Sequence, residues 1–123
     1  MNVALWIATG LLAAIFALAG LLKLSRPKDQ LLAQMAWVED FSPRTVKVIG
    51  ALEVLAAIGL VVPGILGIAT VLVPLAATGL ALLMVGAIIT HGRRKELPLV
   101  AFNLVLLALA VFVAWGRFGD YRL

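Results

Sequence analysis

A single acidic residue, Glu53, lies midway along an apolar stretch of this 123-residue chain. No other charged residue lies between Lys47 and His91. An ionised side chain at the centre of a membrane-spanning helix costs about 2.5–3.5 kcal/mol, so such residues are usually paired, neutral or functional. Glu53 is therefore the residue whose type and position point most directly to a site.

One other polar residue is predicted to lie at a depth similar to that of Glu53, and two more lie at the same side of the bundle. With a rise of 1.5 Å per residue, Glu53 lies about 10–12 Å and Asn103 about 9 Å from the same end of their apolar stretches. Lys23 and His91 end two further apolar stretches at that side. The four side chains can therefore converge at the head of an apolar slot and orient a small amphipathic ligand. We predict as ligand-binding residues Glu53, Asn103, Lys23 and His91.

Each of these residues also has a purely structural interpretation. Glu53 and Asn103 can hydrogen-bond to each other across helices, as polar residues in membrane bundles commonly do. Lys23 can extend its ammonium group to the interface as an anchor. His91 can simply end a helix before the basic run at residues 93–95. The sequence leaves these alternatives open.

The composition argues against several other kinds of site. The chain has no cysteine, so it has no disulfide, thiol nucleophile or thiolate metal site. Its single histidine argues against a multi-histidine metal site, and we predict no metal-binding and no catalytic residue. The basic residues form no patch interleaved with aromatic residues, which disfavours nucleic-acid binding. Whether the chain is an enzyme stays open, and the pattern favours a protein without catalytic activity of its own.

The elements that must position these residues are long apolar segments. The chain is 64% apolar and 13% charged, with a mean hydropathy of +1.16. A soluble domain of this size could not bury so much apolar surface. We predict an all-α fold, an integral membrane four-helix bundle that forms a single domain over residues 1–123. Its spans are expected at about residues 3–24, 44–62, 65–90 and 97–116.

A short amphipathic helix is predicted at the membrane surface between the first two spans. Pro27 suits its first turn, and Trp37 suits the interface. Its apolar face would be separated from a polar face in the way that interfacial helices require. The two faces comprise Leu31, Leu32, Met35 and Val38 on one side, and Lys28, Asp29, Gln34 and Asp40 on the other.

Prolines and small residues indicate further features of the bundle. Ser42 and Pro43 form a helix start, with a capping hydroxyl followed by proline in the first turn. Pro63-Gly64 predicts a tight turn between the second and third spans, and Pro74 is expected to kink the third. Small residues predict where helix backbones approach closely. They include Gly10, Gly20, Gly50, Gly79 and Gly86.

The distribution of basic residues predicts the orientation. The segments after the first and third spans hold eight Lys and Arg residues, whereas the remaining ends and turn hold only Arg117 and Arg122. Because basic loops stay in the cytoplasm, both termini are expected outside a multi-pass cell-membrane protein. Membrane lipids are its first expected partners.

The chain resembles the DoxX-like family of small bacterial membrane proteins. The likeness covers nearly the whole chain and is most specific in the Gly-x-x-Glu element at 50–53, with its spacing to His91 and Asn103. It is carried by Ala19-Gly-Leu-Leu-Lys-Leu24, Met35-Ala-Trp-Val38, Phe41-Ser-Pro43, Gly50-Ala-Leu-Glu-Val-Leu-Ala-Ala-Ile-Gly-Leu60, Pro63, Gly79-Leu-Ala-Leu-Leu-Met-Val-Gly86, His91 and Asn103.

The resemblance implies a four-helix membrane bundle of the bacterial inner membrane. The family takes its name from a membrane subunit associated with thiosulfate–quinone oxidoreduction, and most members have no assigned reaction. Glu53, His91 and Asn103 match the polar positions of the family, and Lys23 matches the basic residue that ends its first span.

Three functions are compatible with these observations. The leading hypothesis is a protein that binds a small hydrophobic or quinone-like ligand, or assists a membrane partner, through a polar core centred on Glu53. A second is a non-catalytic membrane subunit of an oxidoreductase complex of the thiosulfate/quinone type, with a redox partner protein. A third is a structural or assembly role, for example as a homodimer through small-residue faces. No cofactor is predicted, and quinone is the one candidate that the resemblance offers.

Overall fold

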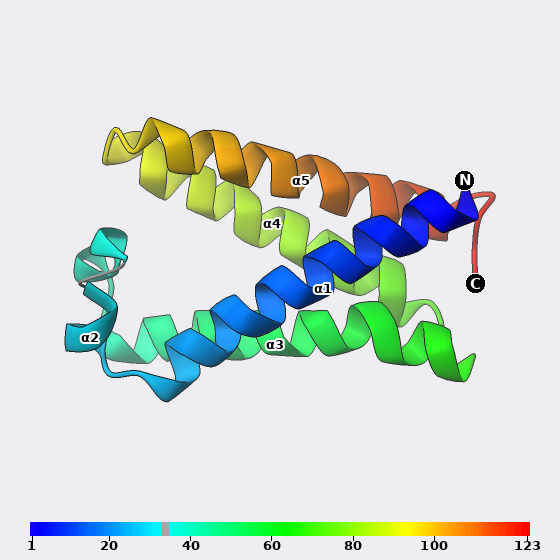
Figure 1. The fold of residues 1–123 in the computed structure, drawn as a ribbon, viewed down its shortest axis with the longest axis horizontal. Coiled ribbons are helices and arrows are strands. Elements are labelled where there is room, and N and C mark those ends of the chain that lie inside the picture. Colours follow the sequence, from blue (N-terminus) through cyan, green and yellow to red (C-terminus); the bar gives the residue numbers. More distant parts are fainter. Residues whose placement is uncertain (33–34) are drawn as a thin grey trace.

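The computed structural model describes residues 1–32 and 35–123, and every regular element in these ranges is a helix. Four helices are long and apolar enough to cross a membrane. This confirms the predicted all-α membrane bundle. The elements in chain order are α1 (Asn2–Ser25), α2 (Lys28–Leu32), the 3₁₀ helix η1 (Ala36–Asp40), α3 (Pro43–Leu66), α4 (Leu72–Arg93) and α5 (Leu97–Phe118), as Figure 1 shows.

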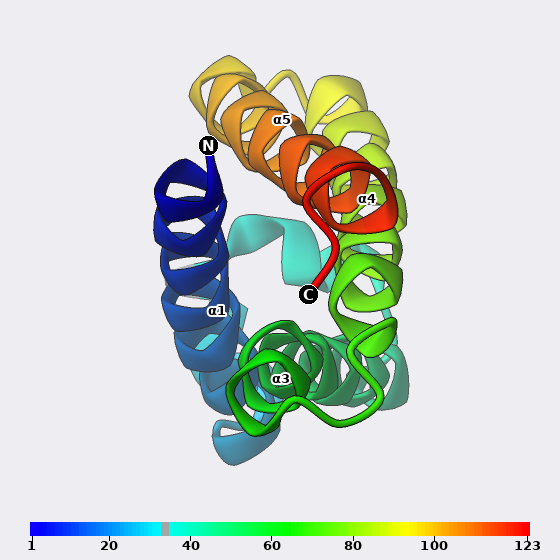
Figure 2. The ribbon, with the colours of Figure 1, turned by 90° about the vertical axis from the view of Figure 1, so that its right-hand side faces the viewer.

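The four long helices surround a central axis (Figure 2), and α1 changes its neighbour along its length. Near one end of the bundle α1 lies against α3, where Gly20 meets Gly50. At the other end α1 lies against α5, where Leu5 meets Gly116. We call the first end, which also carries α2 and η1, the cap end, and the second, which carries both termini, the tail end (Figure 1).

Helix α3 begins as predicted but extends further than predicted. The Ser42 side chain accepts a hydrogen bond from the Thr45 backbone N–H, which caps the helix. The expected tight turn at Pro63-Gly64 is wrong, because the helix continues through both residues. It ends at Leu66 and is capped by Gly67, whose φ of 68° is the left-handed conformation that glycine adopts most readily.

Pro74 lies at the start of its helix, so the reason for expecting a kink there does not apply. Helix α4 starts at Leu72, which places Pro74 in its first turn. Backbone N–H groups in the first turn have no intrahelical partner, and a proline there removes no helical hydrogen bond. The chain between Gly67 and Leu72 makes the turn that the sequence predicts at residues 63–64.

The predicted amphipathic helix is present as two short helices, α2 and η1, rather than one. Residues 33–34, which include Gln34, lie outside the described residues. Leu31 and Val38 are buried with Val46 of α3 in a small apolar cluster. The apolar face that was expected at the membrane surface therefore packs on the protein itself. We call the described parts of residues 28–41 the cap.

The central core is built from all four long helices and lies mainly between the cap and the tail end. Its side chains are aliphatic apart from one phenylalanine and one methionine. The core comprises Ala8, Leu12, Phe16, Leu60, Val73, Ala77, Leu80, Met84, Leu106, Ala110 and Val113.

Candidate functional site

The centre of the site is a buried ion pair between α1 and α3. Lys23 Nζ lies 2.7 Å from Glu53 Oε1. Only 6% of Lys23 and 4% of Glu53 is exposed. The pair follows from the close approach of the two helices, because Gly20 and Gly50 lie one turn before these residues and leave no room for a Cβ atom. Side chains on a helix lean towards its N-terminus, so Lys23 leans inward from the end of α1 towards Glu53.

The side chains of Trp37 and His91 lie beside the ion pair. Lys23 Nζ lies 5.6 Å from the centre of the Trp37 ring, a cation–π geometry. The Trp37 ring meets the His91 ring edge-on at 6.1 Å. His91 Nδ1 lies 3.0 Å from Glu96 Oε1, within hydrogen-bonding distance. The cap thus contacts α1 and α4 over the polar group.

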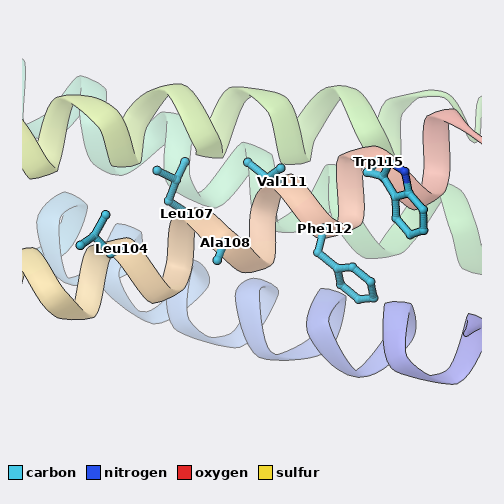
Figure 3. A pocket seen from close by; sticks show the side chains of 6 residues that line it. All are labelled: Leu104, Leu107, Ala108, Val111, Phe112 and Trp115. Atoms are coloured by element: carbon cyan, nitrogen blue, oxygen red, sulfur yellow. The ribbon is translucent and has the colours of Figure 1, made fainter.

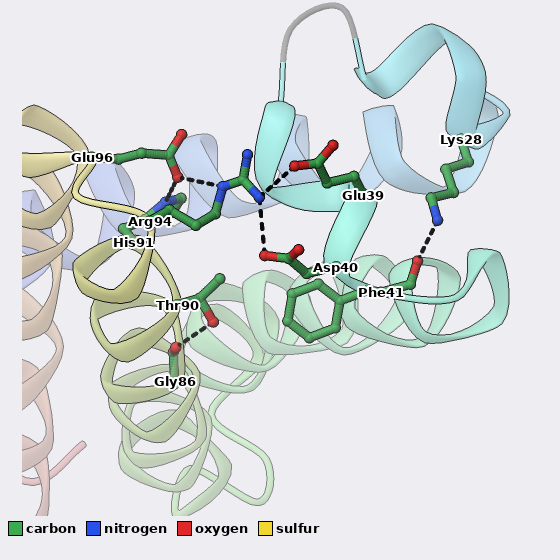
Figure 4. Close-up of polar contacts among 9 residues, drawn as sticks. All are labelled: Lys28, Glu39, Asp40, Phe41, Gly86, Thr90, His91, Arg94 and Glu96. Atoms are coloured by element: carbon green, nitrogen blue, oxygen red, sulfur yellow. Dashed lines mark hydrogen bonds and ion pairs between the residues drawn. The ribbon is translucent and has the colours of Figure 1, made fainter.

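Arg94 joins the cap to the turn between α4 and α5 (Figure 4). Its Nη1 donates to Glu39 Oε1 at 2.8 Å and to Asp40 Oδ2 at 3.0 Å, and its Nε lies 3.3 Å from Glu96 Oε1. The hydrogen bonds to Glu39 and Asp40 raise the pKa of Arg94, so its charge is retained. We call this set of contacts the Arg94 latch.

A cavity of about 650 Å³ lies under the cap, and Lys23, Glu53, His91 and Asn103 all line it. Its size falls within the range of ligand pockets, which is roughly 300–1,000 Å³. Its walls are mainly apolar and aromatic, and come from all four long helices and the cap. The other lining residues are Ile15, Phe16, Ala19, Met35, Ala36, Trp37, Phe41, Ile49, Leu82, Leu83, Met84, Gly86, Ala87, Thr90, Glu96, Leu99, Phe102 and Leu106.

Asn103 differs from the other three polar residues, since the described part of the chain gives its side chain no partner. It is 7% exposed, and among the described residues its amide has no hydrogen-bond partner. Buried polar side chains usually have a partner, because an unpaired one costs free energy. Within the described chain, Glu53 is paired with Lys23 and not with Asn103, so the structural pairing of Glu53 with Asn103 that the sequence allows is not seen.

The sequence analysis does not identify all residues that contribute to this site. It assigns Trp37 to the membrane interface, counts Arg94 only among the basic residues that set the orientation, and gives no role to Glu96. One signal was available for Glu96, because it follows His91 by five residues across a short turn. Nothing in the sequence indicates that Arg94 meets residues 39–40, which lie more than fifty positions earlier.

A second hollow of about 500 Å³ lies along the outer face of α5 (Figure 3). All its lining residues come from this one helix, and none has a charged side chain. In a membrane such a face contacts lipid tails, so we assign no specific site to it. The lining residues are Leu104, Leu107, Ala108, Val111, Phe112 and Trp115.

The tail end of the bundle is closed by a buried arginine. Arg117 Nη1 donates to Asn2 Oδ1 at 2.7 Å and to the Tyr121 carbonyl at 2.8 Å. The guanidinium lies 5.4 Å from the centre of the Trp6 ring. Figure 2 shows the C-terminal residues passing over the central axis at this end. The candidate site therefore belongs to the cap half of the molecule.

The comparisons with known proteins give one match. A family model described as the DoxX-like family matches residues 7–113, a range that contains all four predicted site residues. No curated protein and no solved structure matches the chain.

Proposed function

Because the chain belongs to the DoxX-like family and is a multi-pass membrane protein, we propose that it binds a small hydrophobic molecule in the cavity under the cap. The observation that carries this proposal is the convergence of four polar side chains from α1, α3, α4 and α5 on one largely apolar cavity. A tightly packed core with no space beside Glu53 would have favoured a purely structural role.

The residues of the cavity suit distinct tasks in binding. The apolar walls would cover the hydrophobic part of the molecule, and Asn103 would hydrogen-bond its polar part. The Lys23–Glu53 pair would hold the polar end of the cavity in a fixed arrangement. No group among these residues is placed as a nucleophile, so the proposal is one of binding and not of catalysis.

A quinone is one molecule of this class. Its ring would lie among aromatic side chains such as Trp37 and Phe102, and a carbonyl could accept a hydrogen bond from the amide of Asn103. A quinone supplies two-electron redox chemistry when bound, and the residues named here would only bind and orient it. This fit supports the second candidate function, a membrane subunit that delivers such a molecule to a redox partner.

We further propose that the cap end faces the cytoplasm and that both termini lie outside the cell membrane. Eight of the ten Lys and Arg residues belong to the two segments at the cap end, and two belong to the tail end. Basic segments near membrane spans are retained in the cytoplasm.

Binding is tested with a fluorescence assay in detergent micelles. Trp37 is the one tryptophan in the described cavity wall, so Trp6→Phe and Trp115→Phe make its emission specific. We expect a brominated long-chain alcohol to quench Trp37 in a saturable manner, because bromine quenches only nearby indoles. Unlabelled alcohol should compete, and native mass spectrometry should show a one-to-one complex.

A matched pair of variants tests where the alcohol binds. Gly86 lines the cavity and Gly79 does not, although both lie on α4 and a Cβ atom added to either would meet no atom within 4 Å. Gly86→Leu should weaken saturable quenching, whereas Gly79→Leu should leave it unchanged. Equal behaviour of the two variants, or quenching that rises linearly without saturation, would refute binding in this cavity.

A further inference from the structure

The charges that line the cavity are already neutralised by neighbouring side chains. Lys23 is the one lysine or arginine in its described wall, and it is paired with Glu53 at 2.7 Å. Lys23 and Glu53 are both more than nine-tenths buried, so little water screens their attraction. The Lys23 ammonium group is therefore already paired with the Glu53 carboxylate and is not available to an anionic ligand.

The remaining charged groups near the cavity do not offer a free cation either. His91 lies against Glu96, which also lies 3.3 Å from Arg94. Arg94 is further held by Glu39 and Asp40. An ionised carboxylic acid that enters the cavity would thus find every neighbouring cation already paired with a carboxylate of the described chain. An ionised amine would have to displace Lys23 from Glu53.

Among the described wall residues, Asn103 offers a buried amide that no neighbouring side chain engages. An amide donates and accepts hydrogen bonds and carries no charge. It can therefore satisfy a hydroxyl or a carbonyl on a ligand but cannot compensate a buried charge. The unengaged amide of Asn103 and the Lys23–Glu53 pair together indicate that the cavity accepts an uncharged polar group, such as a hydroxyl or a carbonyl.

We propose that the cavity selects uncharged amphiphiles with a hydrogen-bonding head group, and that Glu53 sets this selectivity by neutralising Lys23. This inference rests on the proposed binding function and adds the chemical class of the ligand. Glu53 acts here as a specificity determinant rather than as a direct anchor for the ligand. Removing its charge would leave Lys23 buried and unpaired, and the cavity would then favour an anionic head group.

The test compares three ligands that share a chain and differ in their heads. Dodecanol, dodecanoate and dodecylammonium compete with the brominated alcohol for Trp37 quenching at about pH 9, where the acid and the amine are both charged. We expect dodecanol to bind the native protein at least about tenfold more tightly than either charged ligand. Glu53→Gln should reverse the order in favour of dodecanoate, and Lys23→Gln should shift it towards dodecylammonium.

A double variant in which the two charges are exchanged distinguishes a change in ligand selectivity from a folding defect. Lys23→Glu combined with Glu53→Lys restores an ion pair and should restore the preference for dodecanol. Dodecanoate binding to the native protein as tightly as dodecanol, or an unchanged order in both folded single variants, would overturn the inference while leaving binding itself intact. Absence of saturable binding by all three ligands would instead refute the proposed function.

Discussion

At the scale of single residues, the Lys23–Glu53 pair is the most deeply buried ion pair among the described residues. Each charge is desolvated, and each is stabilised by the other. Breaking a buried pair by removing one partner leaves an uncompensated charge, whereas replacing both partners with neutral residues is often tolerated. The two residues should therefore be strongly non-additive in stability.

We predict that Lys23→Met alone lowers the free energy of unfolding by about 3 kcal/mol. Glu53→Gln alone should be destabilising for the same reason, although a long polar amide retains one hydrogen-bonding position. The double variant Lys23→Met/Glu53→Gln should recover much of the loss, since no buried charge then remains. Titration with a denaturing detergent in mixed micelles measures all three, and strictly additive losses would show that the two charges do not interact.

The convergence of Glu53, Asn103, Lys23 and His91 on one cavity was predictable from the sequence, but their pairing was not, and their role in binding stays a prediction. The fixed rise of a helix places Glu53 and Asn103 at a similar depth, and Lys23 and His91 at the same end of their spans. Which of them touch depends on how each helix is rotated about its axis and on how closely two helices approach. The small residues indicate where two helices approach, but the sequence does not specify how each helix is rotated. The lack of a partner for Asn103 among the described residues therefore emerged only from the structure.

At the scale of elements, the crossing of α1 and α3 sets the geometry of the ion pair. A Cβ atom at Gly20 would lie 2.6 Å from the Gly50 carbonyl oxygen, and one at Gly50 would lie 2.8 Å from Lys23 Cβ. Real Cβ atoms do not approach so closely, so any side chain here must push the helices apart. The prediction that small residues mark a close approach of helix backbones is thus confirmed at Gly20 and Gly50. A Cβ atom added at Gly10, Gly79 or Gly86 would meet nothing within 4 Å, so no close approach within the described chain requires glycine at these positions.

Gly20→Ala should destabilise the bundle by about 1–3 kcal/mol, the usual cost of overpacking. It should also weaken ligand binding, since it separates Lys23 from Glu53. Gly10→Ala on the same helix is the matched control, because alanine favours helix by up to about 1 kcal/mol and meets no neighbour there. Unfolding in mixed micelles distinguishes the two, and a Gly20→Ala variant as stable as Gly10→Ala would contradict the close crossing.

The cap is held over the cavity by the Arg94 latch, so Arg94 should control access to Trp37. Replacing Arg94 with glutamine removes the charge that Glu39 and Asp40 share, and the cap should open more often. We expect stronger quenching of Trp37 by aqueous acrylamide in the background without Trp6 and Trp115.

The neighbouring Arg93→Gln provides the control for this prediction. Arg93 makes no ion pair among the described residues, yet its loss changes the net charge by the same amount. Raised salt should mimic Arg94→Gln in the native protein, because the latch is partly exposed and therefore screened. Equal quenching in both arginine variants would mean that the latch does not hold the cap.

At the scale of the whole molecule, the two ends of the bundle differ in construction. The tail end is closed by Arg117 and its contacts with Asn2 and Tyr121. The cap end contains the cavity beneath a cap that is attached by the Arg94 latch and by an apolar cluster with α3. Between them, the outer surfaces of the long helices carry many exposed large apolar residues, such as Leu82 at 69% exposed. Such a surface is stable only in contact with lipid. The hydropathy of the sequence was enough to predict this lipid-facing surface, because an apolar outer surface depends on composition and not on the details of packing.

The difference between the ends leads to a prediction about orientation. Because basic segments stay in the cytoplasm, the cap end should face inward and the tail end outward.

The native chain has no cysteine, so single cysteines can be introduced without further changes. Gln30→Cys of α2 and Asp120→Cys after α5 are both exposed and remove no basic residue. In intact cells a membrane-impermeant maleimide should label Asp120→Cys directly, and should label Gln30→Cys only after permeabilisation. The opposite pattern would place the cavity and its cap on the outer side, and labelling of both positions in intact cells would contradict a single fixed orientation.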